Sequence, residues 1–508
     1  MSQQWYDAIS GLAPEIRDEL MNMAGYVKIS DEGQSRLDDT VECLSFAHTD
    51  LGNAERFVHQ HKNDIRYCTA AKTWYIWNGQ YWEEDITEMI YSLARVTIRS
   101  IPREADSCSE DDFNRSAILK WAARSESRER VRAMVELAQS DRAVAIRPDF
   151  FDHDPWLLNC RNGTLNLHTG LLQSHDRQDY ISKQAPVDFD PQAVCPTWER
   201  FIGCIFQSHG DLIEYVRRVC GYCLTGITRE QDFYFLYGTG ANGKSTLIKT
   251  MMALLGTEYA TQASSGTLWA RHYEAPGEEV AVLQGARLVV AMETDQGRKL
   301  AEGLVKQLTG GDRIRARRLY ANSFEFQPTF KVFLAANHKP GISGTDNGIW
   351  RRIKMIPFMV SIAEDQQDVD LGEKLLHELP GILNWTLRGC LDWQQQGLKP
   401  PREVTQATTD YRQDSDYMAA FLGECVMIDD GSRTQCKVVY EAYQNWAACA
   451  GDRPLNLRRF NDCLKEKGFQ TQAGTGNRKF WLGLALRDNQ ADWSDISHEI
   501  AEPSYPVT

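Results

Sequence analysis

One glycine-rich stretch has residue types and spacing suited to holding phosphate. It fits the pattern G-x-x-x-x-G-K-[ST] and reads Gly238-Thr239-Gly240-Ala241-Asn242-Gly243-Lys244-Ser245, followed by Thr246. Glycines let backbone N–H groups turn towards phosphate oxygens, and a helix beginning there adds its partial positive charge. We expect Lys244 to reach the β- and γ-phosphates and the Ser245 hydroxyl to ligate Mg²⁺. The stretch therefore predicts a nucleoside triphosphate site.

The flanking residues predict the strand and helix that such a loop needs. Phe233 to Tyr237 is a short aromatic-rich run typical of a buried strand. Apolar residues then recur at helical spacing, at Leu247, Ile248, Met251, Met252 and Leu255. A chance glycine-rich turn before a helix is the alternative, and the full pattern in this setting argues against it.

A second apolar run ends in acids. Leu288 to Met292 predicts a buried strand, and Glu293 and Asp295 follow it. One acid at this place holds the water shell of Mg²⁺ while its neighbour orients the attacking water. We predict Glu293 as the principal catalytic acid and metal ligand because it is nearest the strand end, with Asp295 beside it.

Two further polar positions lie next to predicted strands. Asn337 follows the strand Lys331 to Ala335, where an amide can contact the γ-phosphate, although many such asparagines only stabilise a turn. Arg351 and Arg352 begin another apolar strand. One of them can project into a neighbouring subunit's nucleotide site, the alternative being a surface salt bridge. The spacing does not decide between the two arginines.

A basic hairpin is predicted between these strands. Residues 306–354 hold ten Lys or Arg against three Asp or Glu. The arms are Ile314 to Leu319 and Phe324 to Phe326, with an aromatic residue near the tip. A solvated basic face is the usual meaning of such a run, but this arrangement suits the anionic backbone and stacking bases of single-stranded DNA. The predicted DNA contacts are Lys306, Arg315, Arg317, Arg318 and Tyr320.

Composition narrows the class of protein. The net charge of −14 argues against a general nucleic-acid coat protein without excluding local DNA contact. No apolar run is long enough to span a bilayer and no signal peptide is evident, so we expect a soluble, cytoplasmic protein without membrane partners. The single CxxC, Cys220 to Cys223, predicts two buried thiols rather than a structural metal site or a disulfide.

The remaining chain is organised by turn signals. Asn78-Gly79 predicts an aromatic hairpin, whose rings we assign to a small core in preference to base stacking. Asn162-Gly163 and Thr169-Gly170 predict further hairpins. From Tyr417 to Leu486 the order is a helix, a polar gap, two helices (Val438 to Ala447 and Leu457 to Glu466) and a strand (Lys479 to Leu486), which suggests a winged helix. The predicted segments are residues 1–148, mostly helical; 149–228, hairpins and helices; 229–375, the ATPase core; 376–415, helix and linker; 416–487, the winged helix; and 488–508, an acidic tail.

Jointly these motifs resemble one family. The stretches GTGANGKST, LVVAMETD, KQLTGGDRIRARRLYANSFEFQPTFK, LAANHKP and GTDNGIWRRIKMIPF are similar to the helicase portion of phage and plasmid primase–helicases. That group is a superfamily 3 branch of the AAA+ class, related to the poxvirus primase–helicase. The resemblance runs from about Ser45 to about Leu486.

The resemblance implies a hexameric ring that uses ATP and Mg²⁺ to move on single-stranded or forked DNA. It assigns Gly243, Lys244, Ser245 and Thr246 to Walker A, Glu293 and Asp295 to Walker B, Asn337 to the sensor, and Arg351 or Arg352 to the arginine finger. The basic hairpin matches the family's DNA-contacting region. Residues 1–45 leave no room for the primase–polymerase domain of many relatives, so a separate primase is expected to act with the chain.

The predicted fold is an α/β P-loop NTPase core of AAA+, superfamily 3 type, with an N-terminal α+β region and a C-terminal winged-helix-like domain. The predicted function is an ATP-dependent replicative DNA helicase of a phage or mobile element, in the bacterial host cytoplasm. An ATP-switched replication initiator that does not unwind processively is the main alternative. A small-molecule P-loop kinase and an RNA helicase are weaker ones, because neither accounts for the basic hairpin and the resemblance together.

Overall fold

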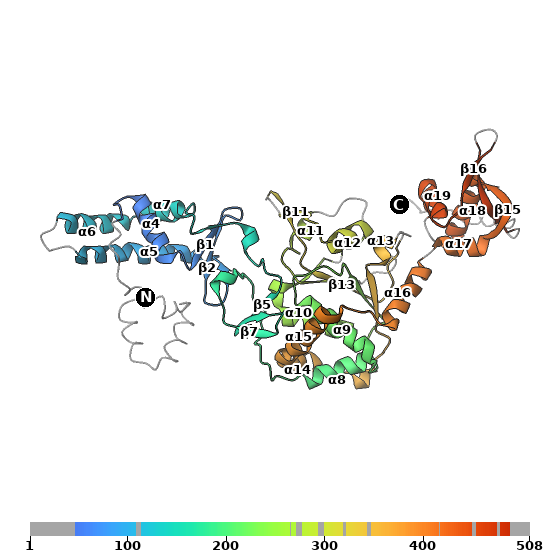
Figure 1. Ribbon diagram of the computed structural model, residues 1–508, viewed down its shortest axis with the longest axis horizontal. Coiled ribbons are helices and arrows are strands. Elements are labelled where there is room, and N and C mark those ends of the chain that lie inside the picture. Colours follow the sequence, from blue (N-terminus) through green and yellow to red (C-terminus); the bar gives the residue numbers. More distant parts are fainter. Residues whose placement is uncertain are drawn as a thin grey trace, which may run out of the picture.

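The computed structural model describes residues 46–107, 113–264, 266–270, 277–292, 299–318, 322–342, 347–415, 417–449, 454–474 and 478–487. The predicted N-terminal helical stretch before residue 46, the acidic tail and the site residues Glu293, Asp295 and Tyr320 lie outside these ranges. The molecule is elongated, with a helical module at one end, a sheet-based body in the middle and a small module at the other end (Figure 1).

The N-terminal module packs helices against a small sheet. Its helices are α4 (Asp50–His61), α5 (Met89–Ser100), α6 (Phe113–Ser125), α7 (Arg128–Ala138) and the 3-10 turn η1 (Ile101–Ser107). Its strands β1 (Ile65–Cys68), β2 (Thr73–Trp77), β3 (Trp82–Glu84) and β4 (Ala145–Ile146) are ordered β3-β2-β1-β4. The Asn78-Gly79 turn joins β2 to β3 as predicted, and Trp74 and Trp82 are buried. These two rings therefore contribute to a core.

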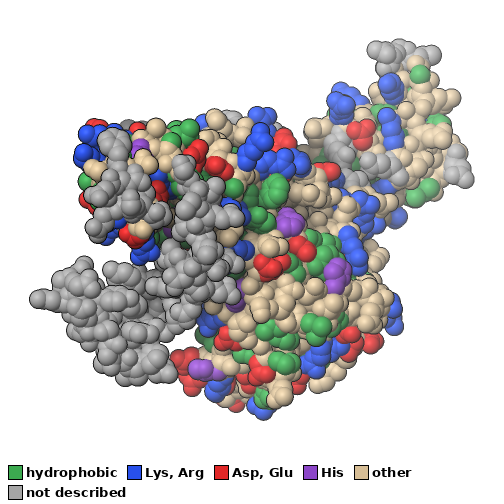
Figure 2. Space-filling model, turned by 60° about the vertical axis from the view of Figure 1, so that its left-hand side comes forward, with side chains coloured by type: hydrophobic (Ala, Val, Ile, Leu, Met, Phe, Trp, Pro, Cys, Tyr) green, Lys and Arg blue, Asp and Glu red, His purple; other side chains and the backbone are tan. Residues whose placement is uncertain are grey.

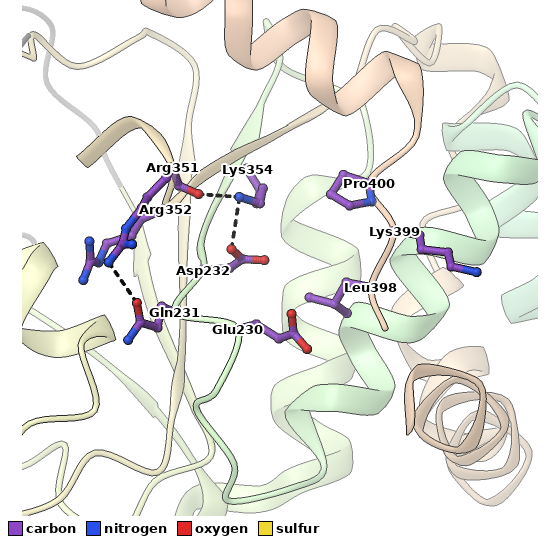
Figure 3. Close-up of a pocket in the computed structure, with 9 residues that line it drawn as sticks. All are labelled: Glu230, Gln231, Asp232, Arg351, Arg352, Lys354, Leu398, Lys399 and Pro400. Atoms are coloured by element: carbon purple, nitrogen blue, oxygen red, sulfur yellow. Dashed lines mark hydrogen bonds and ion pairs between the residues drawn. The ribbon is translucent and has the colours of Figure 1, made fainter. Parts of the chain in front are cut away.

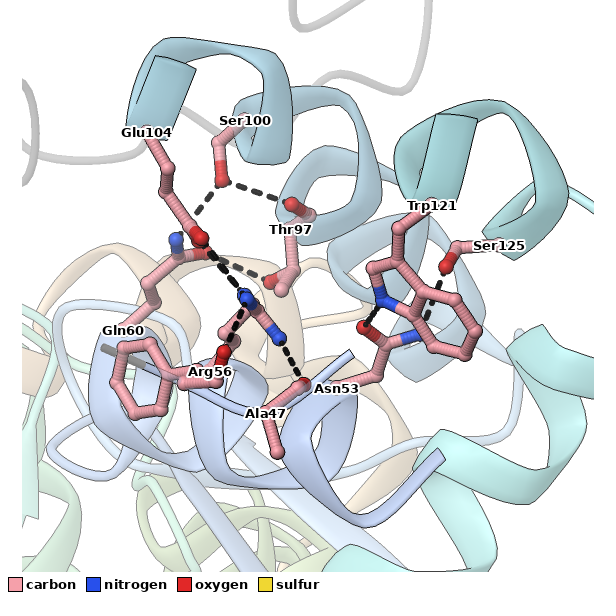
Figure 4. A network of polar contacts seen from close by, with 10 residues as sticks. Ala47, Asn53, Arg56, Gln60, Thr97, Ser100, Glu104, Trp121 and Ser125 are labelled. Atoms are coloured by element: carbon pink, nitrogen blue, oxygen red, sulfur yellow. Dashed lines mark hydrogen bonds and ion pairs between the residues drawn. The ribbon is translucent and has the colours of Figure 1, made fainter. Parts of the chain in front are cut away.

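A buried polar network holds this module together (Figure 4). The Arg56 guanidinium is 1% exposed and donates to Glu104 Oε1 at 2.6 Å and to Ala47 O at 3.0 Å. Asn53 Nδ2 donates to Ser125 Oγ at 3.0 Å, and Trp121 Nε1 donates to Asn53 Oδ1 at 2.9 Å. Because a buried charge is tolerated only when paired, Arg56 fixes α4 against η1.

A three-stranded meander and two helices lead into the body. The strands β5 (Leu157–Cys160), β6 (Gly163–Asn166) and β7 (Leu171–Gln173) are antiparallel, and the two predicted turns join them. They are followed by the 3-10 turn η3 (Arg177–Asp179) and by α8 (Pro196–Ile205) and α9 (Gly210–Cys223). Cys220 and Cys223 are buried thiols on α9, as the helical pattern predicted.

The body is a five-stranded parallel sheet in the order β14-β8-β13-β10-β9. The strands are β8 (Phe233–Tyr237), β9 (Ala260–Gln262), β10 (Leu288–Met292), β13 (Lys331–Ala336) and β14 (Ile353–Pro357). Alternate side chains enter two different cores: Tyr234 and Leu236 pack with α8, α9 and α10 (Lys244–Tyr259), whereas Phe233 and Phe235 face the opposite side. Burial on both faces explains why the strands are nearly continuous apolar runs. The predicted α/β fold with a parallel sheet is thus confirmed.

The second face is covered by α11 (Gly277–Ala281), α12 (Glu302–Thr309), α13 (Asn347–Trp350) and the hairpin β11 (Ile314–Arg317) and β12 (Ser323–Phe326). Helices α14 (Leu371–His377) and α15 (Leu379–Gln396) join the first face. Glycines permit close contact between α9 and α15. A Cβ on Gly221 would lie 2.1 Å from Cys390 N, and one on Gly389 would lie 2.1 Å from Arg217 O.

The C-terminal module follows α16 (Arg402–Asp414), which packs on β14. It comprises α17 (Tyr417–Cys425), β15 (Val426–Gln435), α18 (Cys436–Cys449), α19 (Leu457–Glu466), β16 (Thr471–Ala473) and β17 (Lys479–Leu486). The predicted helices and last strand are present. The segment predicted as a polar gap is β15, whose register shifts between Ile428 and Arg433, around turn-forming residues. The assignment to the winged-helix class stays a prediction.

Two buried cations connect α9 to the sheet. Arg287 donates to Leu224 O and, at 2.5 Å, to Leu157 O. Lys331 Nζ donates to Thr225 O and lies 4.7 Å from the centre of the Tyr222 ring. Burial lowers the pKa of Lys331 to about 7. Lys331 was counted in the basic segment, but it is buried and not part of a DNA-facing surface.

Candidate nucleotide site and basic hairpin

The glycine-rich loop connects β8 to α10, as predicted. Helix α10 begins at Lys244, and Leu247 N donates to Gly243 O at 3.0 Å. Gly243 has a φ of 84°, and a Cβ there would lie 2.5 Å from Ile205 Cγ2. A Cβ on Gly238 would lie 2.3 Å from Phe358 O. Both glycines are therefore required by the packing of the loop against α8 and the end of β14.

Lys244 turns back into this loop. Its Nζ donates to Gly238 O at 2.6 Å, to Asn242 Oδ1 at 3.1 Å and to Asn337 Oδ1 at 3.1 Å. The residue is 6% exposed, and desolvation lowers the pKa of its ammonium group. All three acceptors are neutral, so within the described part of the chain the charge of Lys244 has no carboxylate partner. Such a site favours an anion.

Asn337 reaches the same place from a neighbouring strand. It follows β13, which pairs with β8 in parallel, so the two carboxyl ends lie side by side. In α/β sheets, ligands bind outside the carboxyl ends of the strands. Two residues that are 93 positions apart and were singled out separately, Lys244 and Asn337, thus share a hydrogen bond.

The segment after β14 supports the loop from the other side. Asn242 is 3% exposed, and its Nδ2 donates to Phe358 O at 3.3 Å. Ile362 N donates to Ala241 O at 2.8 Å. The sequence pointed to this segment only through its arginines. Its hydrogen bonds to the loop could not be predicted, because they involve backbone carbonyl and amide groups that every residue type has.

The predicted magnesium ligands are only partly described. Ser245 is exposed in the first turn of α10, and Thr246 beside it is half-buried. Strand β10 ends at Met292 beside β13, at the same carboxyl edge, and the predicted acids Glu293 and Asp295 come next, outside the described residues. A hydroxyl at a helix N-terminus next to an acid-bearing strand end is a suitable donor set for hydrated Mg²⁺. Among described residues, no cluster of three His, Cys, Asp or Glu forms a metal site.

The two predicted finger arginines lie at the opposite edge of the sheet. They precede β14, whose five residues rise about 3.3 Å each, so roughly 16 Å separates them from the carboxyl edge. Arg352 is 9% exposed, and it donates to Thr309 Oγ1 at 3.1 Å and to Gly348 O at 2.6 Å. Arg351 is exposed and donates to Gln231 Oε1 at 3.2 Å. Neither can serve the loop of its own chain.

Arg351 borders a pocket of ≈ 360 Å³ at this amino edge (Figure 3). Lys354 Nζ lies there, 3.1 Å from Asp232 Oδ1. Burial raises the pKa of Asp232 to about 6, and the neighbouring Lys354 opposes that rise. The pocket is lined by charged groups of both signs and has no glycine-rich loop, so it lacks the features of a nucleotide site.

The predicted basic hairpin is present as β11 and β12. Alternation along β11 buries Ile314 and Ala316 and exposes Arg315 and Arg317. The exposed Arg318 donates to Gln284 Oε1 at 3.1 Å and lies 5.6 Å from the centre of the Phe324 ring. Lys306 is half-buried on α12. Tyr320, at the predicted tip, is outside the described residues.

Basic residues are dispersed over one face of the molecule. On the face shown in Figure 2, Lys and Arg side chains occur in separate groups among acidic and apolar ones. This distribution agrees with a net charge of −14 and favours local anion contacts over a general affinity for nucleic acid.

Comparison with known proteins found two matching family models and several similar proteins of large DNA viruses. Residues 54–207 match the family described as "D5 N terminal like", and residues 236–352 match a "Family of unknown function (DUF5906)". A protein named "Putative helicase" in Acanthamoeba polyphaga mimivirus is 29% identical over 336 residues, covering 59% of this chain and 34% of that protein. Another "Putative helicase", in Frog virus 3, is 26% identical over 385 residues, covering 59% of this chain and 39% of that protein.

A "Putative primase" of African swine fever virus is 25% identical over 210 residues, covering 40% of this chain and 22% of that protein. The apo structure of the NrS-1 C terminal region covers 86% of this chain and 99% of that chain, with 8% identity and a TM-score of 0.44. These curated relatives come from large DNA viruses, so the phage origin and bacterial cytoplasm stay predictions. None of the described helices is long and apolar enough to cross a membrane.

The chain spans about a third of the length of the helicase-named relatives, 34% and 39%. The N-terminal family match falls on the part of the chain that includes the helical module. The motifs around Lys244 and Asn337 lie in the part that forms the parallel sheet, within the second family match. The chain therefore has a family relationship with the primase–helicases of superfamily 3 type.

Proposed function

We propose that this chain is the motor part of an ATP-dependent replicative DNA helicase. The observation that supports it most directly is the hydrogen bond between Lys244 Nζ and Asn337 Oδ1 at the carboxyl edge of the sheet. A cation and an amide from adjacent strand ends meet there at the N-terminus of α10, which suits the γ-phosphate of ATP. The proposed core is accordingly a P-loop NTPase of AAA+ type.

Each polar group has a role in this proposal. Residues 238–246 hold the phosphates, and Ser245 with Glu293 holds Mg²⁺, which neutralises charge on the phosphates when bound. Glu293 or Asp295 accepts a proton from the attacking water. Lys244 exchanges its three neutral acceptors for phosphate oxygens, and Asn337 keeps its amide next to the γ-phosphoryl group.

The position of the arginines supports the proposal of a ring. Since Arg351 and Arg352 lie at the amino edge, they can stabilise developing γ-phosphoryl charge only in a neighbouring copy. Arg351 is exposed, whereas Arg352 is buried in bonds to Thr309 and Gly348, so we assign the finger to Arg351. This assignment separates two residues that the sequence left equivalent.

The basic hairpin is proposed to contact the DNA strand. Arg315 and Arg317 project from the exposed side of β11, and Arg318 follows them. Guanidinium groups bind phosphate with two parallel hydrogen bonds, which suits a strand moving past a fixed hairpin.

The test is ATP hydrolysis with and without single-stranded DNA, followed by strand displacement on a tailed duplex. We expect DNA to stimulate hydrolysis by the native chain, and the double change Arg317→Ala, Arg318→Ala to remove only the stimulation. Hydrolysis that ignores DNA, with no strand displacement, would instead support an ATP-switched replication initiator. Absence of hydrolysis with the acids intact would contradict both functions.

A further inference from the structure

A groove lined by arginines lies in the N-terminal module, between α5 and α7. It has a volume of ≈ 470 Å³ and is lined by Arg95 and Arg99 from α5 and by Arg128 and Arg132 from α7. Tyr91 and Val131 form apolar parts of its wall. The module is separate from the sheet that carries the glycine-rich loop and the basic hairpin (Figure 1). We call these four residues and the space between them the arginine groove.

The spacing of these arginines is unfavourable for the helices alone. Residues four apart share one helix face, about 6 Å apart along the axis. Like charges at this spacing weaken a helix. Both helices nevertheless carry such a pair, and the two pairs face the same cavity. Four positive charges gathered there indicate an anion with repeated charges.

The arginines of the groove are also poorly paired. Arg99 and Arg128 make no hydrogen bond or ion pair in the described part of the chain. Arg95 donates to Ser92 Oγ at 2.8 Å, and Arg132 has an exposed contact with Glu136 at 3.4 Å. Glu88 and Glu126 line the same cavity, and within the described part of the chain neither forms an ion pair with the four arginines.

Arginines that stabilise this module behave differently. Arg130, on α7 beside the groove residues, pairs with Asp50 at 2.9 Å and lies 4.4 Å from the centre of the Trp121 ring. Arg56 is buried against Glu104. The contrast shows that arginines elsewhere in the module, including Arg130 on α7 itself, have acidic partners.

We propose that the arginine groove binds the phosphate backbone of single-stranded nucleic acid. Two rows of guanidinium groups at regular spacing suit repeated phosphates, and the Tyr91 ring offers a face to a base. The proposal goes beyond the function proposed above, because it adds a strand-holding site outside the motor body. An acidic protein segment is the competing occupant, and it would leave DNA affinity unchanged.

The experiment measures binding of fluorescein-labelled oligothymidine by anisotropy over a range of salt concentrations, without nucleotide. The full chain is compared with Arg99→Ala, Arg128→Ala, chosen because neither residue has a partner to lose. The matched control is Arg103→Ala, Arg142→Ala, which removes the same charge from exposed positions of the module outside the groove. Thermal unfolding and DNA-free ATP hydrolysis report the integrity of each variant.

We expect the groove variant to bind on the order of ten-fold more weakly, with a salt slope smaller by about 1.4, while the control matches the native chain. Arg99→Lys, Arg128→Lys should keep most of the affinity, because charge is retained. If groove variant and control bind equally well, the proposal is wrong while the helicase function stands. If the native chain itself does not bind the strand, both are wrong.

Discussion

The two edges of the central sheet both hold buried cations that donate to carbonyl oxygens, yet the helix ends beside them differ. At the carboxyl edge, Lys244 lies at the N-terminus of α10, where the helix dipole is unfavourable for a positive charge. At the amino edge, Arg287 and Lys331 donate to Leu224 O and Thr225 O, at the C-terminal end of α9, where the dipole is favourable.

Under the proposed function, this difference distinguishes a cation that binds a ligand from cations that stabilise the fold. We expect Lys244 to gain a better partner when phosphate binds, because its present acceptors are neutral and its helix end favours anions. Arg287 already has its partners and holds the meander, α9 and the sheet together. Four predictions test the comparison.

The largest effect is expected for Lys244→Ala. Without the ammonium group the γ-phosphoryl charge is unsupported, so the rate of ATP hydrolysis should fall on the order of a hundred-fold or more. The melting temperature should be unchanged or higher, because an unfavourable charge leaves a helix N-terminus. Steady-state hydrolysis and calorimetry measure the two quantities. A variant that melts well below the native chain would show that Lys244 is structural.

Arg287→Ala should have the opposite profile. It leaves Leu224 O and Leu157 O without their donor inside the body, which should lower the free energy of unfolding by about 3 kcal/mol. Urea unfolding measures the change. The exposed Arg313→Ala is the control and should have little effect. Equal stability of the two variants would break the distinction between the edges.

Arg352→Ala should lower stability more than Arg351→Ala. The buried guanidinium joins Thr309 to Gly348, and its loss should cost about 2 kcal/mol, whereas the exposed Arg351 contributes little. ATP hydrolysis should show the reverse order once each variant is measured well below its melting temperature. If Arg351→Ala hydrolyses ATP normally, the finger assignment is wrong.

The smallest expected effect is the dependence of folding stability on pH that Lys331 causes. Its pKa is lowered to about 7 in the folded chain, so above that pH the unfolded chain binds a proton that the folded chain does not. Stability of the native protein relative to Lys331→Met should therefore rise with pH, by up to about 1.4 kcal/mol per unit, and should be level below about pH 7. Unfolding curves of both proteins at several pH values provide the comparison, and a difference that does not vary with pH would contradict it.

Local chemistry made much of this structure predictable. The strand before Gly238, the helix after Lys244 and the turns at Asn78-Gly79 and Asn162-Gly163 each depend on residues adjacent in sequence. The hydrogen bond from Lys244 to Asn337 brings together two residues that were each predicted to contact the γ-phosphate.

What the sequence could not supply depends on distant partners. Lys331 is buried because carbonyls 106 and 104 residues away accept from it, and nothing next to Lys331 in the sequence reveals them. The same holds for Arg352, whose partner Thr309 is 43 residues away. β15 was missed because turn-forming residues at its centre hide a strand that β17 completes by pairing.

The central claim is that ATP is hydrolysed where the carboxyl edge of one chain meets the amino edge of the next. Mixing Lys244→Ala chains with Arg351→Ala chains tests it most directly, since each variant lacks a different half of the site. The account predicts that each variant alone is inactive and that the mixture regains part of the native ATP hydrolysis. A mixture as inactive as its components, under conditions where the chains are shown to assemble together, would contradict it.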